Sequence, residues 1–314
     1  VRFAVKMLPW TQLVLVVLSV AQAVVSCPDV CKCSRKSGPE KSEVNCHKKG
    51  LRSLPSNLPP DAWILKLGEW HSDNQSFITG VVARLIFLLI FFSTSINLER
   101  NAIKSIHPKA FSGANQLMLL NLYGNHITVL PPRGFQDLLN LRFLMLGQNQ
   151  IGILKSEMFA GMRNLSDLDL PLNALTALPS NAFKPLIALK LYLRNNELEQ
   201  LPSGAFSNMP KLSQLGLSGN RLKTSPLSFT SALKKLYLHE NPWQCDCNII
   251  SLVRWMGQTK ASMSPRDALK CASPPQLKNK SLSSLRPATL RCKIYSSSIP
   301  VPTMPPVLQR VDAL

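Results

Sequence analysis

The eight cysteines are the residues of this chain best suited to form covalent bonds, and they fall into two groups of four in 314 residues. Two even-numbered local groups indicate disulfides rather than scattered buried thiols, although four cysteines allow three pairings in each group. Zinc binding by the C-x-C pairs is disfavoured, because no histidine lies near ligand spacing. The groups are Cys27, Cys31, Cys33 and Cys46, then Cys245, Cys247, Cys271 and Cys292.

A pair of carboxylates, Asp167 and Asp169, is the second arrangement with chemical potential. Two such groups on one face of a strand could act as general acid and base. The residues expected beside them supply neither a nucleophile nor a metal-binding partner, and of the five histidines only His239 maps to the same face. The sequence therefore predicts a protein that is not an enzyme and that uses no cofactor or metal.

Basic residues dominate the C-terminal region, in a chain whose formal net charge is +19. Between Cys245 and Lys293 nine lysines and arginines are opposed only by Asp246 and Asp267. Such a surface either is simply solvated or attracts polyanions such as heparan sulfate and chondroitin sulfate. The candidate glycosaminoglycan-binding residues are Arg254, Lys260, Lys270, Lys278, Lys280, Arg291 and Lys293.

The first apolar block has the layout of a secretory signal peptide over residues 1–23. Arg2 and Lys6 precede a short apolar run that ends in Ala21-Gln-Ala23, which fits a charged region, a hydrophobic region and a cleavage site. Its removal deletes two basic residues and leaves a net charge of +17. We expect a secreted protein, so nucleic acid is excluded as a partner, and the Asn-x-Ser sequons at Asn74, Asn164 and Asn279 are candidate glycosylation sites.

The element that must position these residues is a repeat. The pattern L-x-x-L-x-L-x-x-N-x-L recurs with asparagines spaced 24, 24, 24, 23, 24 and 21 residues apart, and a phenylalanine follows each of the first six by about ten residues. We expect each unit to supply a short strand with inward leucines, an asparagine that satisfies backbone groups at the turn, and a phenylalanine that packs on the convex side. The asparagines are Asn101, Asn125, Asn149, Asn173, Asn196, Asn220 and Asn241; the phenylalanines are Phe111, Phe135, Phe159, Phe183, Phe206 and Phe229.

One repeat cannot fold alone, because ordering its backbone costs about 1–2 kcal/mol per residue and its few large side chains return only about 1.5–3 kcal/mol each. Stacking closes that gap, and the two ends of a stack need caps. The cysteine groups lie at those two ends.

These motifs resemble extracellular leucine-rich repeat proteins with cysteine-rich flanking modules, the group that includes chondroadherin, Slit, the Nogo receptor and the variable lymphocyte receptors. The resemblance implies an α/β leucine-rich-repeat solenoid, or horseshoe, with a parallel concave sheet and disulfide-bonded caps. It also implies the pairs Cys27–Cys33, Cys31–Cys46, Cys245–Cys271 and Cys247–Cys292. The expected organisation is an N-terminal cap at 27–58, the start of the first repeat at 59–68, repeats at 96–243, a C-terminal cap at 241–293 and a Pro/Ser-rich tail at 294–314.

Residues 69–95 break this rhythm with the apolar stretch GVVARLIFLLIFF at 80–92. A transmembrane helix needs about 20 apolar residues, and this stretch has thirteen with Arg84 among them. A degenerate repeat with an apolar loop is a second interpretation. The favoured one is that 69–95 replace a normal repeat, for instance through retained intron sequence in the gene model.

The residues between the strand leucines are expected to face the concave surface, where aromatic and arginine side chains favour protein binding. A merely solvated sheet face is the alternative. The leading hypothesis is a secreted module that binds a protein ligand there; the others are a matrix component that binds glycosaminoglycan or collagen through the basic cap, and the ectodomain of an adhesion or signalling receptor whose anchor is missing. Membrane association is expected only through such an anchor or a partner. The candidate concave residues are Tyr123, Phe143, Met145, Asp167, Asp169, Lys190, Tyr192, Arg194, Tyr237 and His239.

Overall fold

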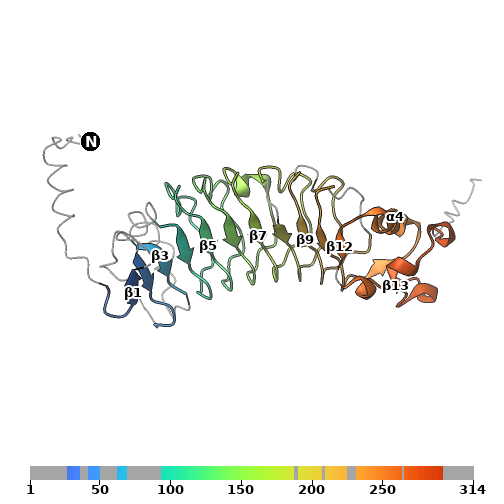
Figure 1. Cartoon of the computed structure of the whole chain (residues 1–314), viewed down its shortest axis with the longest axis horizontal. Helices are drawn as coiled ribbons and strands as arrows, with labels where there is room; N and C mark the ends of the chain where they lie inside the picture. The colour runs from blue at the N-terminus through green and yellow to red at the C-terminus, as the bar shows by residue number, and fades with distance from the viewer. Residues whose placement is uncertain are drawn as a thin grey trace, which may run out of the picture.

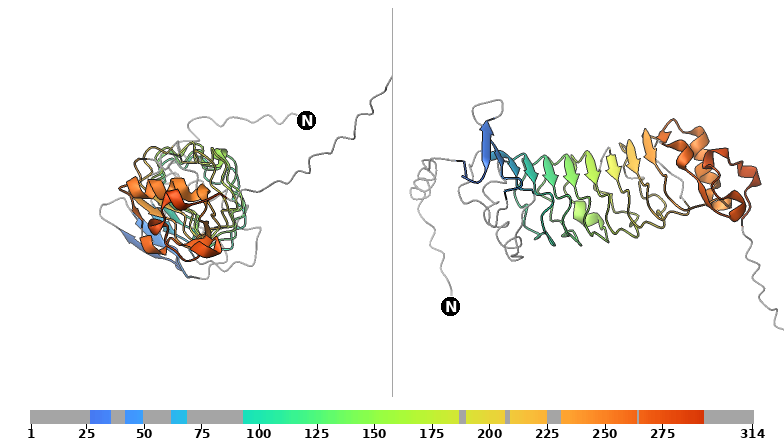
Figure 2. Two further views of the ribbon diagram at one scale, coloured as in Figure 1. Left: turned by 90° about the vertical axis from the view of Figure 1, so that its right-hand side faces the viewer. Right: turned by 90° about the horizontal axis from the view of Figure 1, so that it is seen from below.

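The chain forms a solenoid of stacked coils with a cap at each end (Figure 1), as seen in a computed structural model. One short strand of each coil joins a continuous sheet, and the sheet lies along the concave side of the stack (Figure 2). The expected fold class is thereby confirmed. The structure describes residues 27–35, 42–49, 62–68, 93–186, 190–206, 209–224, 231–263 and 265–292.

The main sheet has eleven strands in the order β1 to β10 and then β12, and every neighbouring pair is parallel except β1 with β2. A second sheet pairs β11 with β13 in the C-terminal cap. The strands are β1 Lys32–Arg35, β2 Ser42–Asn45, β3 Ala62–Lys66, β4 Ser95–Asn97, β5 Leu119–Asn121, β6 Phe143–Met145, β7 Asp167–Asp169, β8 Lys190–Tyr192, β9 Gln214–Gly216, β10 Lys235–Tyr237, β11 Trp243–Gln244, β12 Ser262–Met263 and β13 Cys271–Ser273.

The helices of the described residues are short. They are the 3-10 helices η1 Ser156–Phe159, η2 Cys247–Ile249, η3 Arg266–Ala268, η4 Pro275–Leu277, η5 Leu282–Ser284 and η6 Pro287–Thr289, and the α-helix α4 Ile250–Gln258. Among these residues no helix has the length and apolar character needed to cross a bilayer.

The core runs through the inside of the stack. The central leucine of each strand from β5 to β10 is fully buried, and these leucines are register partners of one another from coil to coil. On the convex side the rings of Phe159 and Phe183 lie 6.1 Å apart, and Phe183 stacks on Phe206 at 6.2 Å. Phe229 lies outside the described residues. Each side chain thus packs on its equivalent one coil away, so neighbouring coils stabilise one another.

The asparagines form the predicted ladder. Asn149 donates to the carbonyls of Leu122 and Leu146, each at 3.0 Å, and its Oδ1 accepts from the Ile127 N–H at 3.0 Å. Six of the seven asparagines make the same donor and acceptor contacts, and Asn101 donates to Leu67 and Leu98. These side chains satisfy buried backbone groups at the turn where strand hydrogen bonding stops.

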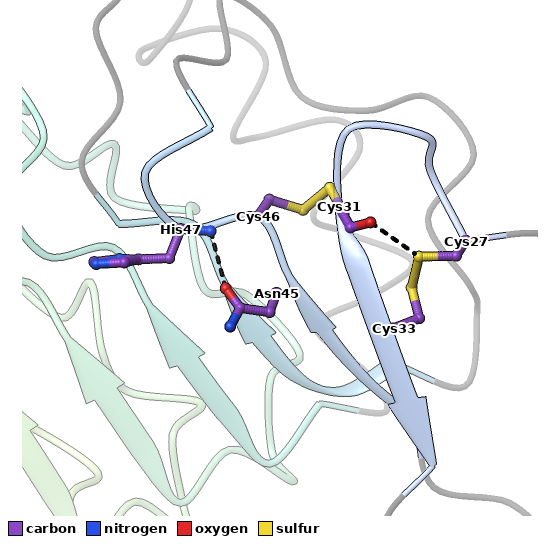
Figure 3. Close-up of a disulfide and its surroundings, with 6 residues drawn as sticks. All are labelled: Cys27, Cys31, Cys33, Asn45, Cys46 and His47. Carbon is purple, nitrogen blue, oxygen red and sulfur yellow. Dashed lines mark hydrogen bonds between the residues drawn. A yellow bond between two sulfur atoms is a disulfide. The ribbon is translucent and has the colours of Figure 1, made fainter.

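Two disulfides hold the N-terminal cap, Cys27–Cys33 and Cys31–Cys46 (Figure 3). Beside them Asn45 Oδ1 accepts from the backbone N–H of His47 at 3.0 Å. Because β2 pairs in parallel with β3, the cap continues directly into the repeat sheet.

The C-terminal cap closes the other end of the core. Trp243 is fully buried two residues after the last ladder asparagine, and its indole N–H donates to the Leu238 carbonyl at 3.2 Å. Helix α4 buries Leu252, Val253 and Met256 against the end of the stack. The bridges Cys245–Cys271 and Cys247–Cys292 complete the cap, so all four disulfides join the pairs that the resemblance implies.

The irregular stretch begins and ends in neighbouring strands. Residues 69–92 lie outside the described residues, whereas Ser93 and Thr94 bond to Ala62 and Trp63. Strand β4 then pairs with β3 in parallel. Residues 93–95, placed in the irregular segment from the sequence, therefore belong to the regular stack.

Candidate ligand-binding face

Three rows of outward side chains on the sheet define what we call the concave face. Strand residues alternate between the core and this face, and the parallel register aligns equivalent residues of successive coils. The first row is Ser95, Leu119, Phe143, Asp167, Lys190, Gln214 and Lys235. The second is Asn97, Asn121, Met145, Asp169, Tyr192, Gly216 and Tyr237; the third is Glu99, Tyr123, Gly147, Pro171, Arg194, Ser218 and His239. All ten candidate concave residues lie in these rows.

The β5–β6 part of the concave face is apolar. Phe143 is 41% exposed and Met145 is 37% exposed, and Leu119, half-buried, is the register partner of Phe143. Adjacent apolar side chains exposed on a sheet leave hydrocarbon in contact with water, and such patches mark interaction sites more often than scattered exposed residues do. This part of the face is suited to cover by another apolar surface.

Strand β7 carries the two carboxylates. Asp167 forms an ion pair with Lys190, with 2.9 Å between its Oδ1 and the lysine Nζ. Its Oδ2 accepts a hydrogen bond from the Ser166 hydroxyl at 2.7 Å. The hydrogen bond between Lys190 and Asp167, together with the negative charge of Asp167, raises the pKa of Lys190. Burial raises the pKa of Asp169 above 3.8, with Arg194 opposing the shift and Asp167 adding to it. The two acids therefore differ in their surroundings, since Asp167 is ion-paired with a lysine and burial disfavours the anion of Asp169.

Arg194 lies between two tyrosine rings. Its guanidinium carbon is 5.1 Å from the ring centroid of Tyr192 and 5.1 Å from that of Tyr237. The Tyr192 hydroxyl donates to Gln214 Oε1 at 3.1 Å, which fixes that ring. Burial raises the pKa of Tyr192, so the hydroxyl stays protonated at neutral pH.

Glycines without special backbone angles make room for these large side chains. A Cβ added to Gly216 would lie 3.1 Å from Arg194 and Tyr192, and one added to Gly147 would lie 2.9 Å from the ring of Tyr123. A large side chain from a neighbouring strand thus packs directly over each glycine, in the space that a Cβ would fill. Sequence reasoning missed this role, although the signal was present: glycine replaces a side chain in these rows.

Not every residue of the rows is available to a ligand. Asn121 is buried; it donates to Glu99 Oε2 at 2.8 Å and accepts from the Tyr123 N–H at 3.0 Å. His239 is half-buried, and its Nδ1 has no hydrogen-bond partner within the described part of the chain. The exposed large apolar side chains of the face are those of Phe143 and Met145 on β6.

The C-terminal cap carries the basic candidates on its surface. Arg254 lies on α4, and five others are exposed as well: Lys260, Lys270, Lys278, Lys280 and Arg291. Lys270 is brought close to Lys280 because the Cys271 N–H donates to the Lys280 carbonyl at 2.9 Å. Lys293 lies outside the described residues. The structure thus groups Lys270, Lys278 and Lys280 around one short antiparallel bridge.

Two of the three sequons fall on described residues. Asn164 is exposed and donates to the Leu139 carbonyl at 2.9 Å. Asn279 is exposed in a left-handed conformation, at φ 66°, between two of the lysines named above. Asn74 lies outside the described residues.

Comparisons with known proteins agree with this architecture. The Leucine rich repeat family model matches residues 94–151, 163–222 and 190–242. The Leucine rich repeat N-terminal domain matches 26–59, and the Leucine rich repeat C-terminal domain matches 268–293.

The chain is also similar to three curated proteins. It is 33% identical over 137 residues to trophoblast glycoprotein of Macaca fascicularis, which is 42% of this chain and 30% of that protein. It is 39% identical over 89 residues to chondroadherin of Homo sapiens, 28% of this chain and 24% of that protein. It is 35% identical over 97 residues to a phospholipase A2 inhibitor of Gloydius brevicaudus siniticus, 30% of this chain and 29% of that protein. The matched region thus spans less than a third of each relative. The chain belongs to the leucine-rich repeat family and carries both an N-terminal and a C-terminal flanking domain.

Proposed function

We propose that this protein is an extracellular binding protein, secreted or held at a cell surface, which recognises a protein ligand on its concave face. One observation carries the proposal: Phe143 and Met145 are exposed side by side on neighbouring positions of a rigid sheet, close to charged and aromatic side chains. A protein surface can cover such hydrocarbon and pair the flanking charges, as interface centres do.

The disulfides and the relatives support an extracellular location. Four bridges in the caps are typical of proteins that fold in an oxidising compartment. One relative is named as an inhibitor of phospholipase A2. Another, 27% identical over 121 residues that are 38% of this chain and 18% of that protein, is named as the leucine-rich repeat transmembrane protein FLRT2 of Rattus norvegicus. The first name supports recognition of a protein, and the second supports the cell-surface form of the proposal. Binding rather than catalysis is the expected activity.

The proposal is tested by screening the purified protein against a panel of secreted proteins and receptor ectodomains, with Phe143→Ser as the main variant. A matched control is Leu139→Ser, because Leu139 is an exposed leucine, 51% accessible, outside the three rows. We expect a saturable ligand whose affinity falls at least tenfold, about 1.4 kcal/mol, with Phe143→Ser and is unchanged with Leu139→Ser. Ligands that bind both variants like the wild type would place recognition elsewhere.

A second candidate function, polyanion binding by the basic cap, is favoured by the grouping of Lys270, Lys278 and Lys280. We expect the triple variant with serine at these positions to elute from immobilised heparin at lower salt than the wild type. The control replaces Lys104, Lys109 and Lys155, which are exposed outside the cap, and so removes the same net charge. If both triple variants elute at equally lowered salt concentrations, the loss of heparin binding reflects overall charge and not a site in the cap.

A further inference from the structure

The environment of Arg194 gives the concave face a specific chemical preference. Tyr192 and Tyr237 stand on strands that are two apart in the sheet, so their bases are separated by roughly 9.6 Å, twice the usual strand spacing. The guanidinium carbon lies 5.1 Å from the centroid of each ring, so it contacts both. Beneath it is Gly216, whose missing side chain leaves the space that Arg194 occupies.

The guanidinium is thus within cation–π distance of two aromatic rings, which hold its carbon in place and leave its N–H groups to make polar contacts. In the described part of the chain, no carboxylate oxygen lies within 4.0 Å of a guanidinium nitrogen of Arg194, so this arginine forms no ion pair there. Asp169 acts on it only at longer range, and the neighbouring carboxylate Asp167 is already paired with Lys190. An arginine fixed in this way loses little freedom when it binds a carboxylate in the two-pronged geometry that it prefers.

We propose, on the basis of the proposed function, that Arg194 between Tyr192 and Tyr237 is a binding site for a carboxylate side chain of the protein ligand. The exposed Lys235 on β10 adds a second positive charge to the same end of the concave face. The ligand residue is an aspartate or a glutamate.

The pattern of charge favours a protein over a sulfated polysaccharide. Asp167 and Asp169 stand on β7, between the apolar residues of β6 and the arginine site. A polyanion repeats its negative charge along its whole length and would place sulfate against these two acids. A protein segment can present a carboxylate at one point only and an apolar or basic side chain elsewhere.

The spacing of the strands sets the spacing in the ligand. The guanidinium lies over Gly216 on β9, three strands from Phe143 and Met145 on β6, which corresponds to about 14 Å. An extended peptide that crosses the sheet advances about 3.4 Å per residue, so four residues cover that distance. The ligand motif expected for an extended segment is an apolar residue and an acidic residue at positions i and i+4, in either direction.

The probe is a library of random 12-residue peptides displayed on phage and selected on the disulfide-bonded protein. Selected peptides are resynthesised, and their dissociation constants are measured by fluorescence polarisation. The variants are Arg194→Gln, which keeps size and removes charge, Phe143→Ser, and the control Arg163→Gln, an exposed arginine outside the three rows. Unchanged circular dichroism and melting temperature establish that each variant is folded.

We expect the apolar–acidic spacing among selected peptides, and at least a tenfold loss of affinity with Arg194→Gln but none with Arg163→Gln. Replacing the acidic residue of the peptide by its amide should weaken binding to the wild type by the same factor as Arg194→Gln does. The same replacement should not weaken binding to the Arg194→Gln variant any further. Gly216→Ala, which pushes against Arg194 without removing it, should weaken binding, whereas Gly152→Ala should not, because its new Cβ would approach no atom closer than 3.8 Å.

Two failures are distinguishable. One outcome is peptides whose affinity falls with Phe143→Ser but which carry no acidic residue, or whose affinity is unchanged by Arg194→Gln. This outcome would show that the carboxylate site is wrong and leave the proposed function standing. A selection that yields no peptide sensitive to Phe143→Ser would count against both. If a heparin hexasaccharide displaces the peptides and itself needs Arg194, the site is one for sulfated ligands and the proposal is wrong.

Discussion

Replacing Asn149 by alanine tests whether the asparagine ladder holds neighbouring coils together. The Ile127 N–H would lose its acceptor, and the carbonyls of Leu122 and Leu146 would each lose one of two asparagine donors. A buried orphan donor costs about 1–3 kcal/mol and each lost hydrogen bond about 0.5–1.5 kcal/mol, which sums to roughly 2–6 kcal/mol. That is a large part of the roughly 5–15 kcal/mol by which domains are usually stable.

The assay is urea unfolding followed by far-ultraviolet circular dichroism, with the loss taken from the midpoint at constant slope. The control is Asn140→Ala, because Asn140 is exposed and makes a comparable contact across coils, donating to the Asn115 carbonyl at 2.8 Å. Asn149→Asp should be worse than Asn149→Ala, because a carboxylate oxygen would replace the amide nitrogen that faces three carbonyl oxygens. A loss under 1 kcal/mol, or one equal to that of Asn140→Ala, would refute the reasoning.

Three further predictions concern the core, the concave face and a cap. Phe159→Ala should cost about 3–5 kcal/mol in urea unfolding, because a fully buried ring leaves a cavity; a loss below 1 kcal/mol would contradict this packing. Burial raises the pKa of Asp169 above 3.8, so the carboxyl group binds its proton more tightly in the folded form than in the unfolded form. The carboxyl group therefore lowers the free energy of unfolding as the pH rises from 3.8 through the folded-state pKa. Asp169→Asn should therefore raise the melting temperature at pH 7 and leave it unchanged at pH 3. A melting temperature that falls at pH 7 only would contradict this prediction. Removing the Cys247–Cys292 bridge, which joins residues 45 positions apart, should cost about 4 kcal/mol by loop entropy, measured by urea unfolding of the double serine variant against the disulfide-bonded wild type. Fully reduced wild type should unfold no later than this variant, and a variant as stable as the disulfide-bonded wild type would contradict the prediction.

The repeat architecture could be predicted because its residues act through the chain's own periodicity. Asn149 and Phe159 recur at fixed spacing, and each makes the same contact in every coil, so one pattern predicts them all. The same alternation placed Phe143 and Met145 on the outer side of the sheet, where the structure shows them exposed.

The arrangement on the concave face could not be predicted in the same way, because it depends on which side chains meet across strands. Arg194 leans over Gly216 to reach Tyr237, a residue 43 positions away, and neither the direction of the lean nor the role of the glycine is encoded in spacing. Asn121 alternates like a surface residue, yet it is buried and hydrogen-bonded to Glu99. Side-chain packing between unlike neighbours decides such cases.

The repeat units also differ in length without losing alignment. Leu65 and its partner Ile96 are 31 residues apart, Ile96 and Leu120 are 24 apart, and Leu215 and Leu236 are 21 apart, yet the same rows continue through all of them. The strands thus keep their register although the outer path of the chain differs in length from coil to coil. A protein engineer could lengthen, shorten or tag that outer path in one coil and still keep every contact residue on the opposite surface in its place.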